Sequence, residues 1–130
     1  SDKDERDMGI RAIKQIDIRP DNPDKEVGLM SGGNQQKVVL GKWIMRDLKV
    51  LIVDEPTAGI DVGAKDQIYA ILEDLAKQGV VVILVTSDLQ ELIRVSHRIL
   101  VMRKGSIIKE FNSGVVTQSM VLEAGSGIVD

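Results

Sequence analysis

The sequence predicts an α/β fold with a mainly parallel sheet, on three observations. Two runs of aliphatic and β-branched residues, Val50–Val53 and Val80–Thr86, are typical of strands buried on both faces. Between them, Asp61 can cap a helix that continues to about Gln78, with apolar residues along one face and Gly79 after its end. Strand, helix and strand in this order predict a right-handed βαβ unit with parallel strands.

Composition favours one soluble globular unit. The 130 residues are 43% hydrophobic, which is enough to build a core, and the net charge of -3 is made of interspersed signs. Nothing in this balance favours nucleic acid or an anionic bilayer as a partner. There is no cysteine, hence no disulfide framework, and no apolar run approaches the ~20 residues that cross a membrane. We expect a cytosolic chain, and the abrupt beginning at Ser1 favours a fragment.

The first 28 residues divide into a helix and a loop. Asp2–Asp7 is highly charged, and apolar residues near helical spacing follow it, so a short amphipathic helix is expected to end near Gln15 or Ile16. Asp17–Gly28 contains two prolines and several acidic or amide residues, which predicts an extended connecting loop.

The loop leads to Ser31–Lys37, which reads Ser-Gly-Gly-Asn-Gln-Gln-Lys and precedes apolar residues at helical spacing. Serine and two glycines ahead of a helix leave backbone N–H groups at the positive end of the helix dipole, which suits a phosphate. An ordinary helix start, with Ser31 as the N-cap, is the alternative. Three amide residues in a row, Asn34, Gln35 and Gln36, favour the anion site.

Two carboxylates directly follow the central strand. Asp54 and Glu55 come after Val50–Val53, and Pro56 follows them. Ligands of open α/β sheets bind at the carboxyl ends of the strands, so these acids lie where chemistry is expected. The alternative is a strand that ends in an acidic turn.

The C-terminal third is expected to continue with a helix, a hairpin and a last helix. The helix starts at Ser87 or Asp88 and runs to about Val95; the hairpin joins Arg98–Arg103 to Ser106–Phe111 through Lys104 and Gly105; the last helix is Thr117–Ala124. The glycine-rich tail from Gly125 is expected to fray.

Three of these segments together resemble the ABC ATPase family. Ser31–Lys37 resembles its signature motif, Leu51–Thr57 its Walker B strand and Ala58–Asp61 its D-loop. The residues of these motifs are similar to those of the second ATPase cassette of tandem-cassette bacterial importers for monosaccharides. The match runs from about Ile16 to the last helix. The resemblance implies a partial P-loop NTPase fold: residues 1–46 as the end of the helical subdomain with the signature motif and following helix, and 47–130 as the C-terminal part of the catalytic α/β subdomain.

The resemblance also implies roles for these residues. Asp54 would hold Mg²⁺ through its water shell, and Glu55 would polarise the water that attacks the γ-phosphorus of ATP. The signature segment would contact ATP held by a second cassette, through Ser31, Gly32, Gly33, Asn34 and Gln35. Asp61 would act across the same interface between cassettes.

Two departures from the family pattern limit these roles. No segment reads Gly-x-x-x-x-Gly-Lys-Ser/Thr, so the Walker A phosphate cradle is absent and the isolated chain is expected to be inactive. Ser87 stands where the family has its switch histidine and is our second catalytic candidate. Because a serine cannot carry a positive charge, the site around Glu55 is expected to be the weaker of a pair.

The absence of the Walker A segment also affects the expected sheet, because a strand that would pair with its neighbours is missing. In the family fold, the strand carrying the cradle lies between the strands corresponding to Val80–Thr86 and Arg98–Arg103. Open strand edges are prone to association. We therefore expect these two strands either to pair directly with each other or to pair between chains in a dimer.

The resemblance implies a fragment of an ABC-type ATPase that couples ATP binding and hydrolysis to import of a sugar or similar small solute. Its partners would be a second ATPase cassette, transmembrane permease subunits and, indirectly, a periplasmic or extracellular solute-binding protein, on the cytoplasmic face of the cell membrane. Two alternatives remain: a non-catalytic module that completes a partner's ATP site, and an ABC-type ATPase of DNA repair. The sugar-type wording and the acidic balance disfavour the DNA-repair alternative.

Overall fold

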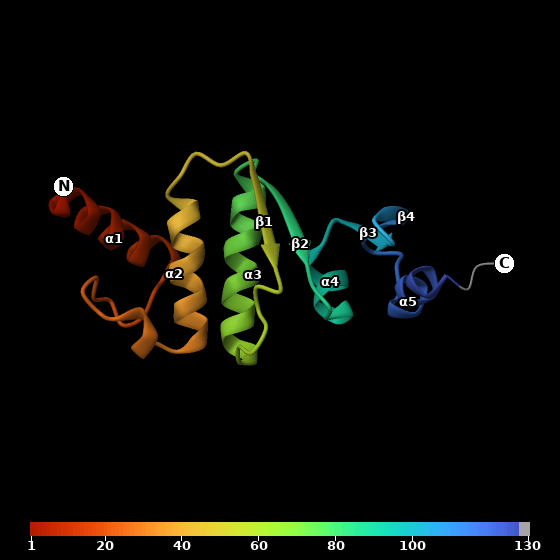
Figure 1. The fold of residues 1–130 in the computed structure, drawn as a ribbon, viewed down its shortest axis with the longest axis horizontal. Helices are drawn as coiled ribbons and strands as arrows, with labels where there is room; N and C mark the ends of the chain where they lie inside the picture. Colours follow the sequence, from red (N-terminus) through yellow and green to blue (C-terminus); the bar gives the residue numbers. More distant parts are fainter. Residues whose placement is uncertain (128–130) are drawn as a thin grey trace. The chain divides into compact units, whose positions relative to one another are not determined.

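The computed structural model describes residues 1–127 and divides the chain into two compact units, Ser1–Ile83 and the part from Leu84 onward. The first unit contains α1 (Asp2–Ile16), the 3₁₀ turn η1 (Val27–Leu29), α2 (Gly32–Ile44), β1 (Val50–Asp54) and α3 (Val62–Lys77). Strand β2 (Val81–Val85) crosses the boundary. The second unit contains α4 (Leu89–Val95), β3 (Arg98–Arg103), β4 (Ser106–Asn112) and α5 (Gln118–Ser126), and Figure 1 labels most of these elements.

The strands of residues 1–127 form two small sheets rather than one mainly parallel sheet. Strands β1 and β2 are neighbours, and their arrows run in the same direction in Figure 1. Strands β3 and β4 form the expected antiparallel hairpin, and its turn residues Lys104 and Gly105 both have positive φ. The described strands thus pair as β1 with β2 and as β3 with β4. Pairing of β2 with β3, or of these strands between chains, stays a prediction.

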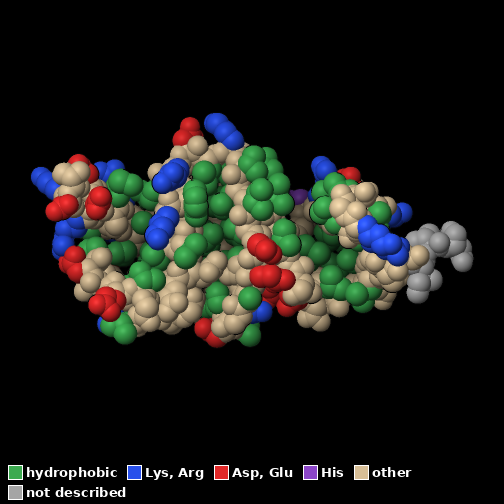
Figure 2. Space-filling model, viewed as in Figure 1, with side chains coloured by type: hydrophobic (Ala, Val, Ile, Leu, Met, Phe, Trp, Pro, Cys, Tyr) green, Lys and Arg blue, Asp and Glu red, His purple; other side chains and the backbone are tan. Residues whose placement is uncertain are grey.

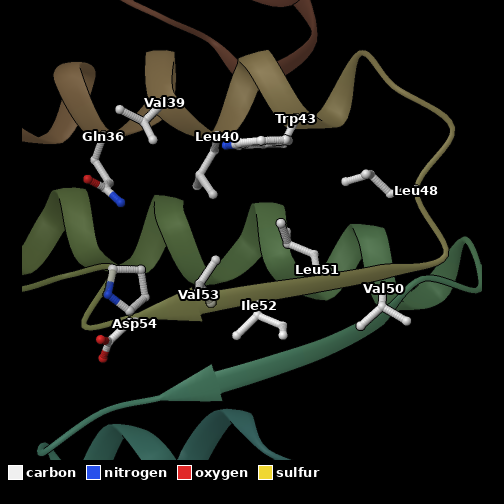
Figure 3. A pocket seen from close by; sticks show the side chains of 11 residues that line it. Gln36, Val39, Leu40, Trp43, Leu48, Val50, Leu51, Ile52, Val53 and Asp54 are labelled. Atoms are coloured by element: carbon white, nitrogen blue, oxygen red, sulfur yellow. The ribbon is translucent and has the colours of Figure 1, made fainter.

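One face of the parallel pair is exposed, although we expected both faces to be buried. Leu51 and Val53 are buried and point toward the helices in Figure 3, whereas Ile52 on the opposite face is 66% exposed. Val81 and Ile83 of β2 are exposed too, and Figure 2 shows hydrophobic side chains gathered over the two strands. The expectation fails because, in the first unit, the helices cover one face only.

Each unit has its own apolar core. In the first unit, the end of α1 packs against α2 through buried Ile13, Ile16 and Ile18, with Val38 and Ile44 of α2 against them. In the second unit, the hairpin packs with α4 and α5 around the buried residues Ile99, Val101, Val116, Val121 and Ala124. In the first unit, α1 and α2, which were predicted from apolar spacing, therefore supply this core.

The helix ends follow the predicted capping residues closely. Asp61 caps α3, since its Oδ1 accepts a hydrogen bond from the backbone N–H of Ala64 at 3.0 Å. Gly79 follows α3 with a φ of 93°, a conformation that favours glycine. Helix α1 ends at Ile16, as expected, and α5 extends through Gly125 to Ser126, so this part of the tail is helical. The rest of the predicted frayed tail, residues 128–130, lies outside the described residues.

Two further expectations concern the chain as a whole. The division after residue 46 follows family subdomains, whereas the compact units meet after residue 83, and the subdomain division stays a prediction. Among residues 1–127, no helix combines the length and the apolar character that crossing a membrane requires.

Candidate functional site

The signature segment begins at the N-terminus of α2, where Ser31 is the N-cap. The backbone of Ser31 is extended, and its Oγ accepts a hydrogen bond from the backbone N–H of Asn34 at 3.4 Å. The Nδ2 group of Asn34 donates to the same oxygen at 3.0 Å. An N-cap side chain satisfies only part of the helix start, so the N–H groups of Gly32 and Gly33 have no acceptor within the helix. The capped helix start is thus present, and it still offers donors to an anion.

The two amide side chains that follow hold neighbouring loop segments. Oδ1 of Asn34 accepts a hydrogen bond from the backbone N–H of Arg19 at 2.7 Å. Nε2 of Gln35 donates to the backbone carbonyl oxygen of Met30 at 2.9 Å. Contact of Asn34 and Gln35 with a nucleotide stays a prediction; within the chain their amides organise the loop in front of α2.

Lys37 is a buried cation that sequence reasoning passed over. Its side chain is 3% exposed, and Nζ donates a hydrogen bond to the backbone carbonyl oxygen of Asp17 at 2.7 Å. Burial lowers the pKa of Lys37, and the negative charge of Asp17 partly opposes that effect. The lysine joins α2 to the end of α1. A signal was present, because Lys37 lies four residues after Gly33 and three before Leu40, on the buried side of the helix.

Gly33 lets the start of α2 lie directly against the start of α3. A Cβ atom built on Gly33 would stand 2.5 Å from Cβ of Ala64 and 3.7 Å from Cγ2 of Ile60. The resemblance implies that Gly33 contacts a nucleotide, and a residue without a side chain would let the backbone approach a phosphate closely. The structure adds a packing reason within the chain, and it brings the signature segment and the D-loop together in the first unit.

The two predicted acids stand at the end of β1. Asp54 is exposed and is the last residue of the strand (Figure 3). Glu55 is half-buried and has a φ of 46°, a left-handed conformation that is uncommon for residues other than glycine. Such backbone strain is found at functional sites when the surroundings hold it in place.

Buried residues after Glu55 supply that support. Pro56 and Thr57 are buried, and Oγ1 of Thr57 lies 3.0 Å from the hydroxyl oxygen of Tyr69 on α3, within hydrogen-bond distance. The backbone N–H of Ala58 donates to the carbonyl oxygen of Glu55 at 3.1 Å, which closes a turn. The left-handed Glu55 is therefore built between a strand and an anchored turn.

The donor set at the strand end suits a magnesium ion that is shared with a phosphate. Within residues 1–127 no group of three or more His, Cys, Asp or Glu side chains could hold a metal ion by itself. Mg²⁺ is commonly bound through one or two carboxylates together with substrate phosphates and water. Asp54, an exposed carboxylate beside Glu55, fits that role and would hold the ion only together with a nucleotide.

Ser87, the second catalytic candidate, lies in the second unit. It is exposed and follows β2 within a short turn, in which the backbone N–H of Asp88 donates to Oγ1 of Thr86 at 3.1 Å. Asp88 then caps α4 by accepting from the backbone N–H of Glu91 at 3.1 Å. Because Glu55 belongs to the first unit, a joint site of Glu55 and Ser87 stays a prediction.

A cavity of about 400 Å³ lies between α2 and β1 (Figure 3). Its walls are mostly apolar, with Val39, Leu40 and Trp43 on the helix side and β1 on the other. Trp43 is 48% exposed, and the guanidinium carbon of Arg46 lies 5.4 Å from the ring centroid, so this tryptophan is not a core residue. Gln36 of the signature segment and Asp54 at the end of β1 also line it, and none of the lining residues, all of which the structure describes, is a lysine or an arginine that could bind a phosphate.

Comparison with known proteins supports the resemblance. The family model described as "ABC transporter" matches residues 1–58. The arabinose import ATP-binding protein AraG of Pseudomonas savastanoi pv. phaseolicola is 46% identical over 119 residues, which are 92% of this chain and 24% of that protein. The ribose import ATP-binding protein RbsA of Streptococcus agalactiae serotype Ia is 50% identical over 115 residues, 88% of this chain and 23% of that protein.

Solved structures show the same fold. MJ1267, an ATP-binding cassette of an ABC transporter, superposes with a TM-score of 0.76 at 23% identity and covers 91% of this chain and 48% of its own. The bacterial ABC transporter cassette MJ0796, solved as a dimer, gives a TM-score of 0.71 at 23% identity, over 86% of this chain and 48% of its own. The fold is therefore that of about half an ATP-binding cassette. The chain is thus similar to ABC transporter ATP-binding proteins over most of its length, and it spans about a quarter of the length of the curated relatives it matches.

Proposed function

We propose that the chain is part of an ATPase subunit that couples ATP binding and hydrolysis to the uptake of a sugar or a similar small solute. The observation that carries this proposal is the packing of the signature segment on the D-loop, with Gly33 against Ala64 and Ile60. It presents two capped helix starts, at Ser31 and Asp61, in one unit. The similarity to proteins named for arabinose and ribose import supports the solute class.

The two motifs would serve two different nucleotides. Asp54 would hold Mg²⁺ on one ATP, and Glu55, from its strained position at the end of β1, would orient the attacking water and take up its proton. Mg²⁺, when bound, neutralises the charge that develops on the phosphates. Ser31 and the N–H groups that follow it would bind the γ-phosphate of the ATP held by a second cassette. The dimeric structure of MJ0796 supports such a pairing of cassettes.

The remaining partners follow from the same proposal. Transmembrane permease subunits would provide the pathway, and a periplasmic or extracellular solute-binding protein would deliver the solute, with this chain at the cytoplasmic face of the membrane. Nucleic acid is not a proposed partner, since the net charge is -3. By itself the chain would not turn over ATP, because it has no backbone cradle for the phosphates.

The test compares two substitutions in the full-length protein, reconstituted with its permease. Gly32→Glu places bulk and negative charge beside Ser31, and a Cβ at this position has open space, its nearest neighbour being the Gly59 carbonyl oxygen at 4.0 Å. We expect near-complete loss of uptake of radiolabelled arabinose or ribose. Glu55→Gln should reduce uptake less, because Ser87 in place of the switch histidine makes that ATP site the weaker one.

Two results would contradict the proposal. Normal ATP turnover and uptake in the Gly32→Glu variant would remove the signature segment from the mechanism. Loss of turnover in Glu55→Gln as complete as in Gly32→Glu would show that the site with Ser87 is fully competent. Lys42→Ala, on the exposed side of α2, is the matched control and should retain uptake.

A further inference from the structure

The hydroxyl group of Ser31 has both of its acceptor positions in use. A serine oxygen has two lone pairs and carries one hydrogen. The backbone N–H of Asn34 approaches this oxygen to 3.4 Å, and Nδ2 of Asn34 approaches it to 3.0 Å. Ser31 itself is exposed. The hydroxyl is therefore left with its hydrogen to donate outward, and it suits an acceptor such as a phosphate oxygen.

The orientation of the Asn34 amide follows from its other partner. The backbone N–H of Arg19 lies 2.7 Å from the Asn34 side chain, and a backbone N–H can only donate. The atom that faces Arg19 must therefore be Oδ1, and Nδ2 must face Ser31. This fixes the amide, whose oxygen and nitrogen are otherwise assigned only from their surroundings.

The donor at the beginning of this chain of hydrogen bonds is itself held in place. Ile18, next to Arg19, is 3% exposed, and its backbone N–H donates to the carbonyl oxygen of Ile13 at 3.1 Å. On the other side, the buried Lys37 donates to the carbonyl oxygen of Asp17 at 2.7 Å. The segment 17–19 is thus attached both to α1 and to α2, so the Arg19 N–H has a fixed place relative to the signature segment.

We propose that Asn34 is a positioning residue that orients the Ser31 hydroxyl as a hydrogen-bond donor to the terminal phosphate of a nucleotide. The hydrogen bonds run in one direction, from the Arg19 N–H to Asn34 and from Asn34 to Ser31, and aligned hydrogen bonds polarise one another. This inference rests on the proposed function, which brings a γ-phosphate to Ser31. Gln35 takes no part, because its amide donates to Met30 instead.

The inference predicts an effect that depends on the γ-phosphate. Asn34→Ala removes the amide donor, and Asn34→Asp keeps the size and the acceptor for Arg19 but turns an oxygen toward Ser31, so the hydroxyl donates to the new carboxylate. Both should weaken the apparent affinity of the assembled, full-length protein for ATP about tenfold, as expected for a lost hydrogen bond to a charged group. The affinity for ADP, which lacks the γ-phosphate, should stay within about twofold.

The double variant shows whether Asn34 acts through Ser31. We expect Ser31→Ala alone to weaken ATP affinity by a similar factor, and Asn34→Ala added to Ser31→Ala to cause no further loss. Lys42→Ala, on the exposed side of the same helix, is the control for a change in α2. Affinities are measured by fluorescence competition with each nucleotide, and melting temperatures are recorded for every variant.

The outcomes separate the two proposals. If Ser31→Ala leaves ATP affinity unchanged, the proposed role of the signature segment fails. If Ser31→Ala weakens ATP binding but the effect of Asn34→Ala is fully additive to it, the positioning role fails while the proposed function stands. Equal losses for ATP and ADP, accompanied by a lower melting temperature, would make Asn34 a residue of structural importance only and would also overturn the inference.

Discussion

Gly33 has a role that can be measured without any nucleotide. A methyl group at this position would stand 2.5 Å from Cβ of Ala64, closer than carbon atoms of packed side chains approach. We expect Gly33→Ala to lower the free energy of unfolding by about 1–3 kcal/mol, the usual effect of overpacking. Urea unfolding of the purified chain, followed by circular dichroism, gives the value.

Two matched variants isolate the cause. Gly32→Ala adds the same methyl group where space is open, so it should be neutral or slightly stabilising. Ala64→Gly combined with Gly33→Ala should recover part of the loss, because it removes the atom that clashes. Equal stability of the Gly33→Ala and Gly32→Ala variants would show that α2 and α3 do not meet in this way.

Lys37 makes the stability of the first unit depend on pH. Its pKa in the folded chain lies below the ordinary value of 10.5, with burial as the main cause. Between these two values the unfolded chain binds more protons than the folded chain, so the burial of Lys37 is least favourable at low pH and is relieved as the pH rises through this window. As the pH rises through this window, the free energy of unfolding of the wild type should therefore rise relative to that of Lys37→Met.

The comparison uses urea unfolding of both proteins from about pH 7 up to the ordinary pKa of 10.5, so that it includes the window between the folded and the unfolded pKa. Lys37→Met keeps most of the side-chain volume and has no titrating group, so other ionisable residues contribute equally to both curves. A difference between wild type and variant that stays constant over this range would contradict the lowered pKa of Lys37.

At the scale of elements, the outer face of β1 and β2 stands out. A sheet with aliphatic residues on both faces normally has cover on both faces, and here Ile52 is 66% exposed and Val81 is 57% exposed. Exposed apolar patches and open strand edges both promote association. The purified chain should therefore form dimers or larger assemblies at micromolar concentrations.

Ile52→Lys should shift the chain toward the monomer in sedimentation velocity, with little loss of stability because the side chain is already largely exposed. Val62→Lys, which adds the same charge at a residue of α3 that is 78% exposed, is the control and should associate like the wild type. A monomeric wild type, or an equal effect of the two lysines, would show that this sheet face does not drive association.

Local patterns account for most of the elements. Apolar spacing predicted α1 and α3, the capping residue Asp61 predicted the start of α3, and the turn at Lys104 and Gly105 predicted the hairpin. These features depend on residues that are close in the sequence. The exposure of one sheet face could not be predicted. An apolar run such as Val50–Val53 indicates that a strand can be buried, but it does not indicate whether other elements cover both of its faces.

The local features of the candidate site could also be predicted from the sequence, whereas its long-range contacts could not. The cap at Ser31 follows from the identity of one residue and was anticipated as one of two interpretations. The contact of Gly33 with Ala64 and the hydrogen bond from Arg19 to Asn34 join residues that are far apart in the sequence, and no local pattern indicates them. The left-handed conformation of Glu55 could not be predicted from the sequence either, because it depends on the buried turn that follows.

As a whole, the chain resembles the family in its signature segment and its Walker B strand end, but its sequence contains no Walker A cradle. The chain covers 48% of the MJ1267 cassette, and its sequence contains no Gly-x-x-x-x-Gly-Lys-Ser/Thr segment. The N–H groups at the start of α2 and the carboxylates at the end of β1 would each need phosphates that are held by another part of an assembly. ATP affinity of the chain alone should then be very weak.

Isothermal titration calorimetry of the purified chain with Mg-ATP measures this directly. Circular dichroism first establishes that the sample is folded, and the Asp54→Ala variant shows whether any heat arises at the end of β1. We expect heats no larger than those of dilution and no release of phosphate on prolonged incubation. Saturable binding with a micromolar dissociation constant, reduced by Asp54→Ala, would contradict it and would show that the chain forms a nucleotide site by itself.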